Sequence, residues 1–425
     1  MKVNYKYIPD IKKMSVFLLL ILFSSLNIGV LQAQSIDDYL QMAAKNNPKL
    51  QSAYADFEAA LQQSPQVSSL PDPTLTVSAF GRMIETRVGR QEARINFMQM
   101  FPWFGTLKAK EDAANLMAES GFYQYLDIRN QVFFEIKSLY AELYALDKTI
   151  DLQKEQLKIL DSYKDLAVSQ FKSADAPMVN VVKIDIKQDE MRTEIELLEE
   201  LKEPLKAKFN LLLNRDIAEE IQIQDTMLFE MNADLINGNF DEHPSVALFH
   251  KQEEAFKMQQ LSAKKEGLPM VGFGFDYSVI SSRDVENLEG NGRDAIMPMV
   301  SITLPIYRKK YKASVKQAEL MGESAVKSQK SQINELQGEY ESTKYELMRA
   351  EKKLNLYDRQ IQSSQKALKL LRSGFSNSLS GFDELLQMNQ DLIDYETQKI
   401  EAIKAGIIAE AKMDYLFSKK EEYAN

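Results

Sequence analysis

The stretch Met270 to Ile280, which reads MVGFGFDYSVI, decides the fold of this chain. Its apolar residues alternate with small or polar ones: Val271, Phe273, Phe275, Tyr277 and Val279 against Gly272, Gly274, Asp276 and Ser278. A period of two over a whole segment is typical of a β-strand with one apolar face. The length suits a tilted strand that crosses a bilayer, which needs about 9 to 11 residues. The alternation alone fits a strand of a small soluble sheet equally well.

Further segments alternate in the same way. Residues 295–304 complete a hairpin at about 270–304, and another hairpin is predicted at about 73–101. Four strands cannot close a membrane barrel, because the smallest need about eight and an open sheet edge is not tolerated in lipid. If these strands lie in a membrane, several chains must share one barrel. Three copies would supply about twelve strands, a number that suits a membrane barrel.

Aromatic side chains and then cations follow the end of each hairpin. They are Phe101, Trp103 and Phe104 before Lys108 and Lys110, and Tyr307 and Tyr311 beside Arg308, Lys309, Lys310 and Lys312. Aromatic residues followed by cations suit a membrane interface with anionic head groups. The flanks therefore favour membrane strands over a small soluble sheet.

Two long stretches, 106–213 and 307–417, contain hardly any Gly or Pro. Apolar residues recur there in alternating steps of four and three, for example Val132, Ile136, Leu139, Leu143, Leu146 and Ile150. This seven-residue period predicts left-handed coiled-coil packing. A helix over 106–172 would extend roughly 100 Å, which suits a tube across the periplasm. Heptads alone would favour an ordinary antiparallel coiled-coil spacer, and the membrane-type hairpins reverse that preference.

The chain repeats itself, since matching landmarks recur in the same order. Asn47-Pro48 and His243-Pro244 each open a helix that leads into a hairpin and then into a long helical stretch. The expected order is a signal peptide at 1–33, a first repeat at 34–213, a connector at 214–242, a second repeat at 243–417 and a short tail at 418–425.

The N-terminus predicts export. Four lysines precede an apolar run, Val16 to Phe23, that is shorter than the roughly 20 residues of a membrane span. The absence of cysteine excludes disulfides, thiolate metal sites and lipid attachment through an N-terminal Cys. A formal net charge of −10 gives no positive field to attract phosphates, so no nucleic-acid partner is expected.

The sequence predicts no catalytic, cofactor-binding or metal site. His243 and His250 fit a helix cap and a helix surface better than a metal site. Gly272-Phe273-Gly274 lacks the third glycine of a dinucleotide motif. The thioethers of the 19 methionines could guide Cu(I) or Ag(I). Because the methionines are scattered along the sequence, packing is the preferred interpretation.

Taken in order, these features resemble the TolC-like outer-membrane efflux proteins. The motifs are Leu70-Pro71-Asp72-Pro73, Phe101-Pro102-Trp103-Phe104-Gly105, Leu304-Pro305-Ile306 and the helical breaks at 171–180 and 375–383. The resemblance implies a mainly α fold with a membrane β-barrel contribution: a homotrimer with a twelve-stranded barrel in outer-membrane lipid, a long α-helical tunnel and an equatorial region, here 214–242. It also implies a periplasmic adaptor and an inner-membrane pump as partners.

The resemblance assigns roles to particular residues. Asp383 would line the closed periplasmic aperture, with Glu384 and Asn180 at neighbouring or matching positions. The helix-hairpin tips that would contact the adaptor include Phe171, Pro177, Gly374, Phe375, Gly381 and Phe382. The barrel would join the tunnel at Pro102, Trp103, Gly105, Pro305 and Tyr307. A helix-capping role for Asp383 fits the sequence about as well as an aperture role.

Two functions remain open. One is a passive exit channel of the outer membrane that reaches into the periplasm and performs no chemistry. The alternative is a periplasmic coiled-coil scaffold or adaptor without a pore.

Overall fold

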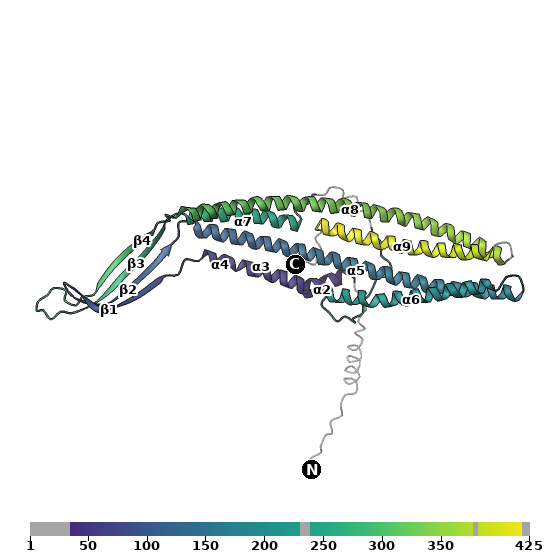
Figure 1. Cartoon of the computed structure of the whole chain (residues 1–425), viewed down its shortest axis with the longest axis horizontal. Coiled ribbons are helices and arrows are strands. Elements are labelled where there is room, and N and C mark those ends of the chain that lie inside the picture. Colours follow the sequence, from purple (N-terminus) through teal and green to yellow (C-terminus); the bar gives the residue numbers. More distant parts are fainter. Residues whose placement is uncertain (1–34, 230–238, 377–380, 419–425) are drawn as a thin grey trace, which may run out of the picture.

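The computed structural model describes residues 35–229, 239–376 and 381–418. The predicted signal peptide and nearly all of the predicted tail lie outside these residues. The protein is a long curved rod with a sheet at one end and helices along the rest (Figure 1). Among the described helices, none combines the length and hydrophobicity needed to cross a membrane.

The order of elements repeats along the chain. The first set is α2 (Ile36–Asn46), α3 (Pro48–Leu61), α4 (Gln63–Ser68), β1 (Thr74–Thr86), β2 (Gly89–Phe101), α5 (Thr106–Lys172) and α6 (Val179–Leu212). The second set is α7 (Pro244–Glu266), β3 (Met270–Ser281), β4 (Ala295–Thr303), α8 (Arg308–Ser376) and α9 (Phe382–Leu416). Each set carries one strand hairpin and then one long helical hairpin.

The two strand hairpins form one sheet. Its strand order is β1-β2-β3-β4, and every neighbouring pair is antiparallel. The central pair aligns Phe97 of β2 with Phe275 of β3. The strands contain 13, 13, 12 and 9 residues, enough for a tilted strand to cross a bilayer. The prediction of four strands in two hairpins is confirmed.

The helical shaft has the predicted long helices. α5 contains 67 residues and α8 contains 69, so each extends roughly 100 Å. The heptad positions Ile136 and Leu143 of α5 and Leu336 and Leu347 of α8 are buried. The helix and coiled-coil predictions are therefore confirmed, and the apolar seam packs the helices along their length.

Both repeats begin their helices with the same device. The Asn47 side chain accepts hydrogen bonds at the start of α3, and the His243 side chain accepts one from Ser245 N at the start of α7. Each is followed by a proline, which needs no backbone donor at the first helical position. The matching caps support the predicted repeat.

Candidate functional site

The two faces of the sheet differ in chemistry. One face presents apolar side chains to the surroundings: Val77 is 67% exposed, Phe273 55% and Ile296 70%. A folded chain normally buries such side chains, and large exposed apolar patches mark interaction or membrane surfaces. This face needs an apolar partner outside the chain.

The opposite face of the sheet is polar at its centre. Asp276 of β3 is 3% exposed and pairs with Arg94 of β2 at 2.7 Å, while Asn96 donates to the same carboxylate oxygen at 3.3 Å. Gln91 donates to the Ser278 hydroxyl at 2.8 Å. The two hairpins are thus joined by a hydrogen-bonded network on the face that the alternation in β3 predicted to be small or polar.

The sheet meets the helices through two short linkers, where the predicted junction residues lie. Gly105 caps α5 with φ +76°, a left-handed conformation that favours glycine, and the Lys265 ammonium lies where a β-carbon would stand. Trp103 precedes it and accepts the Thr106 N–H at 3.0 Å. The other linker contains Pro305 and Tyr307 and leads directly into α8.

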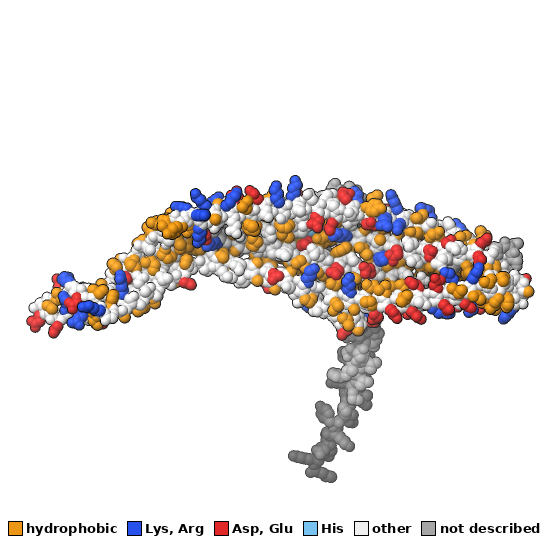
Figure 2. All heavy atoms as spheres, viewed as in Figure 1, with side chains coloured by type: hydrophobic (Ala, Val, Ile, Leu, Met, Phe, Trp, Pro, Cys, Tyr) orange, Lys and Arg blue, Asp and Glu red, His pale blue; other side chains and the backbone are white. Residues whose placement is uncertain are grey.

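The junction is rich in exposed aromatic groups. Trp103 is 40% exposed, Phe104 86% and Tyr307 82%. Hydrophobic side chains gather where the sheet meets the helices, with Lys and Arg beside them (Figure 2). Aromatic groups followed by cations are typical of residues at a bilayer surface.

The far ends of the two helical hairpins pack on each other. Phe375 of α8 and Phe382 of α9 are each 5% exposed, with ring centroids 5.1 Å apart. They share an apolar cluster with Leu160, Tyr163, Ala167, Val181, Ile184 and Leu385. Gln170 of α5 donates to the Phe375 carbonyl at 2.9 Å. The tips of the two repeats therefore form one packed unit within a chain.

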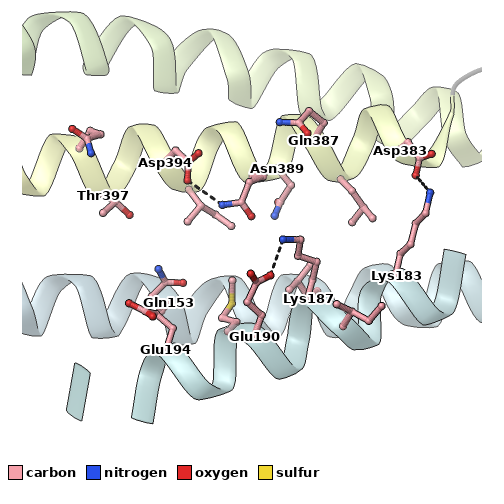
Figure 3. Close-up of a pocket in the computed structure, with 17 residues that line it drawn as sticks. Gln153, Lys183, Lys187, Glu190, Glu194, Asp383, Gln387, Asn389, Asp394 and Thr397 are labelled. Carbon is pink, nitrogen blue, oxygen red and sulfur yellow. Dashed lines mark hydrogen bonds and ion pairs between the residues drawn. The ribbon is translucent and has the colours of Figure 1, made fainter. Parts of the chain in front are cut away.

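An open groove of about 820 Å³ lies between α6 and α9 behind these tips (Figure 3). At its tip end, the Lys183 ammonium of α6 and the Asp383 carboxylate of α9 form an ion pair of 2.5 Å. Asp383 is exposed, as is Glu384 beside it in the first turn of α9. Asn180, at the matching position of the first repeat, is buried with an exposure of 8%.

Solved outer-membrane proteins share this architecture. The outer membrane protein VceC from Vibrio cholerae has a TM-score of 0.72 and 16% identity, covering 90% of this chain and 95% of that chain. The CmeC channel of Campylobacter jejuni has a TM-score of 0.70 and 14% identity, covering 92% of this chain and 87% of that chain. The open MtrE channel of Neisseria gonorrhoeae has a TM-score of 0.69 and 15% identity, covering 90% of this chain and 88% of that chain. This chain has the TolC-like fold. No family model and no curated protein matches its sequence.

Within the TolC-like fold, the tip residues differ in their access to solvent. Phe171 is 45% exposed near the end of α5, and Pro177 lies in the turn before α6. Phe375 and Phe382 face the cluster inside the chain. The second break begins later than Gly374, which is still helical in α8, and residues 377–380 lie outside the described part. Gly381 caps α9.

Lys183 is the tip residue that sequence reasoning missed. It lies one helical turn after Asn180, and nothing in the sequence alone pairs it with Asp383, 200 residues away. The signal was the repeat: Asn180 and Asp383 occupy matching positions after the two breaks, so side chains one turn from either are neighbours once the hairpins pack. The ion pair gives the exposed Asp383 carboxylate a cation from the other hairpin of the same chain.

The middle of the TolC-like shaft contains buried ionisable groups. The pKa of His243 is lowered to about 4, mainly because burial disfavours the charged ring; its Nε2 lies 3.2 Å from the Tyr415 carbonyl oxygen. Burial raises the pKa of Asp127, whose carboxylate accepts from the Tyr415 hydroxyl at 3.2 Å. These groups tie α7, α5 and α9 together, and His243 is the predicted helix cap.

Two tyrosine hydroxyls hold the described part of segment 214–242, the predicted connector, which precedes α7. Tyr39 of α2 accepts the N–H of Gln222 at 2.9 Å, and Tyr140 of α5 accepts the N–H of Gln224 at 2.9 Å. Both rings belong to an apolar cluster with Phe209. The connector is therefore fixed against the first repeat over its described part.

Across the described residues, no group of three or more His, Asp or Glu side chains is placed to hold a metal ion. His250 is on the surface of α7, with Nδ1 4.0 Å from a Glu254 carboxylate oxygen. The sites of interest are thus the two faces of the sheet and the packed tips.

Proposed function

We propose that this chain is the outer-membrane exit channel of a tripartite efflux or export system. Three copies share one barrel of twelve strands, and their helices form a tunnel that carries cargo passively from the periplasm to the exterior. An inner-membrane pump supplies the energy for transport, and a periplasmic adaptor docks the channel onto the pump. The channel itself performs no chemistry.

The observation that carries the proposal is the sheet. Its outer face exposes apolar side chains, and its edges, β1 and β4, are open in the single chain. Lipid covers the apolar face in this arrangement. The open edges are closed when β4 of one copy pairs with β1 of the next copy. A soluble periplasmic scaffold would leave both the apolar face and the open edges exposed to water.

The similarity to solved outer-membrane channels over 90–92% of the chain supports the same conclusion. An exit channel also explains why the helices continue so far from the sheet, since a tunnel must reach the pump complex. The packed tips, with Phe171 exposed beside them, are the surface that we assign to the adaptor.

Fractionation and conductance test the proposal. The protein expressed with its signal should be found in the outer membrane and should migrate as a heat-sensitive trimer on gels. Purified trimers in planar bilayers should conduct, and the same sample should not conduct after boiling. A monomer recovered from the soluble periplasmic fraction would overturn the proposal.

A further inference from the structure

The methionines of the sheet are not scattered once the strands pair. Five of the 19 lie on one face, at positions 98 and 100 of β2, 270 of β3, and 297 and 299 of β4. All five lie on the face of the sheet that carries Asp276, whereas Phe273 and Phe275 lie on the opposite face. Throughout β2, β3 and β4, which are fully described, the opposite face carries no methionine. Strand pairing thus gathers on one face five methionines that are scattered in the sequence.

Two glycines let these thioethers approach one another. Gly274 pairs with Met98 on one side and with Met299 on the other, so no side chain stands between the two methionines. At Gly272, the Met98 sulfur lies 3.1 Å from the position that a β-carbon would take, and the Met100 sulfur lies closer still. Both sulfurs therefore occupy the same small hollow above the glycines.

The sulfur of Met299, on β4 across from Gly274, lies on the same face beside the polar network. The Asn96 amide nitrogen is 3.7 Å from the sulfur of Met299 and 3.3 Å from a carboxylate oxygen of Asp276. Neighbouring strands are about 4.8 Å apart, so methionines on β2 and β4 that lean over β3 can bring their sulfurs within reach of one ion.

Packing volume alone does not explain this segregation. Branched and aromatic side chains fill the other face of the same strands, and methionine would serve there as well. Thioethers are soft, neutral ligands that select soft monovalent cations such as Cu(I), whereas carboxylates and carbonyls suit harder ions. Met98, Met100 and Met299 place three such ligands on this face, and the Asp276 carboxylate nearby is already bound by Arg94 and Asn96.

We propose that Met98, Met100 and Met299 form a thioether site that binds one soft monovalent cation, Cu(I) or Ag(I), per chain. Met270 and Met297 offer further thioethers on the same face. The site needs only the packed sheet; that such an ion is cargo rests on the proposed channel function.

Silver binding to the purified full-length protein in detergent tests the site. In chloride-free buffer, calorimetric titration with Ag(I) should show one equivalent per chain, and Zn(II) should show none. The triple variant Met98→Leu, Met100→Leu, Met299→Leu keeps the side-chain volume and removes the sulfurs. It should bind Ag(I) at least about tenfold more weakly. The double variant Met321→Leu, Met348→Leu, which changes exposed positions on α8, should bind as the unchanged protein does.

X-ray absorption of the silver-loaded unchanged protein provides a second measurement that does not depend on any variant. It should show sulfur neighbours around the ion. Unchanged affinity in a folded triple variant, or a shell of oxygen and nitrogen only, would overturn the site. Conductance without silver binding would overturn the site alone, and silver binding without conductance would overturn the channel.

Discussion

The helical shaft and the sheet differ in how far their apolar side chains are buried. In the shaft, Leu336 and Leu385 are 1% and 0% exposed, although both lie on long, narrow helical hairpins. In the sheet, Val77 and Ile296 are exposed by about two thirds, at 67% and 70%. The difference shows that the chain buries these shaft side chains by its own folding, whereas those of the sheet stay exposed in the single chain.

The largest effect that tests this comparison is expected in the shaft. Leu385→Ala removes a fully buried side chain from the tip cluster and should lower the free energy of unfolding by about 2 to 5 kcal/mol. Leu370→Ala, at a 74% exposed position of α8, should change it by less than about 0.5 kcal/mol. Urea unfolding followed by circular dichroism measures both. Equal effects would mean that the tips do not pack within one chain.

A somewhat smaller effect is expected in the sheet, and it needs a membrane to appear. Phe275→Arg should cost about 2 to 4 kcal/mol per chain if this 46% exposed side chain faces lipid near the midplane. Thr76→Arg is the matched change on the opposite face, in the row of Asn96 and Asp276. The yield of heat-sensitive trimer should fall for the first and be retained for the second. Full assembly of Phe275→Arg would exclude lipid contact at this face.

The pH dependence of the shaft provides a third test. An unfolded chain protonates His243 below about pH 6.5, whereas the folded chain does so only near pH 4. Stability should therefore fall as the pH drops through this window, by on the order of 3 kcal/mol. The change in unfolding free energy between pH 7.5 and pH 4 measures it.

His243→Asn is the matched variant, because Asn47 already caps the corresponding helix of the first repeat. It should keep the cap and lose that part of the pH dependence. Asp127, whose raised pKa acts in the opposite direction, and the nearby Glu339 and Lys412 are unchanged in the variant. A pH profile identical to that of the unchanged protein would show that His243 is not the group responsible.

The smallest effect on stability is expected at the ion pair between the tips. Lys183 and Asp383 are largely exposed, so the pair should contribute at most about 1 kcal/mol. Its effect on conduction should be clearer. Asp383→Asn should weaken cation selectivity and block by multivalent cations, because three carboxylates would be lost from one ring.

Lys183→Met removes the neighbouring cation and should shift selectivity in the opposite direction. Opposite shifts in planar-bilayer recordings would place Asp383 at the aperture. Unchanged selectivity and block in both variants, with intact trimers, would leave Asp383 as a first-turn helix residue only.

The sequence alone determined the elements of this protein. The alternation in Met270–Ser281 has the period of a strand, and the heptads around Ile136 and Leu336 have the period of a helix. Periodicity is a local property of the chain, so it can be recognised in the sequence alone. The breaks near Pro177 and Gly381 were readable for the same reason, because turns have local chemistry.

Only the tertiary structure decided which distant residues meet. Lys183 with Asp383, Asp276 with Arg94, and Met98 and Met100 with Met299 are each brought together from different repeats. Such contacts depend on the register between strands and the rotation of each helix, and a shift of one residue would place other side chains together. The glycines of β3 show this best: in the sequence they are merely small residues, and in the sheet they form the hollow that the thioethers fill.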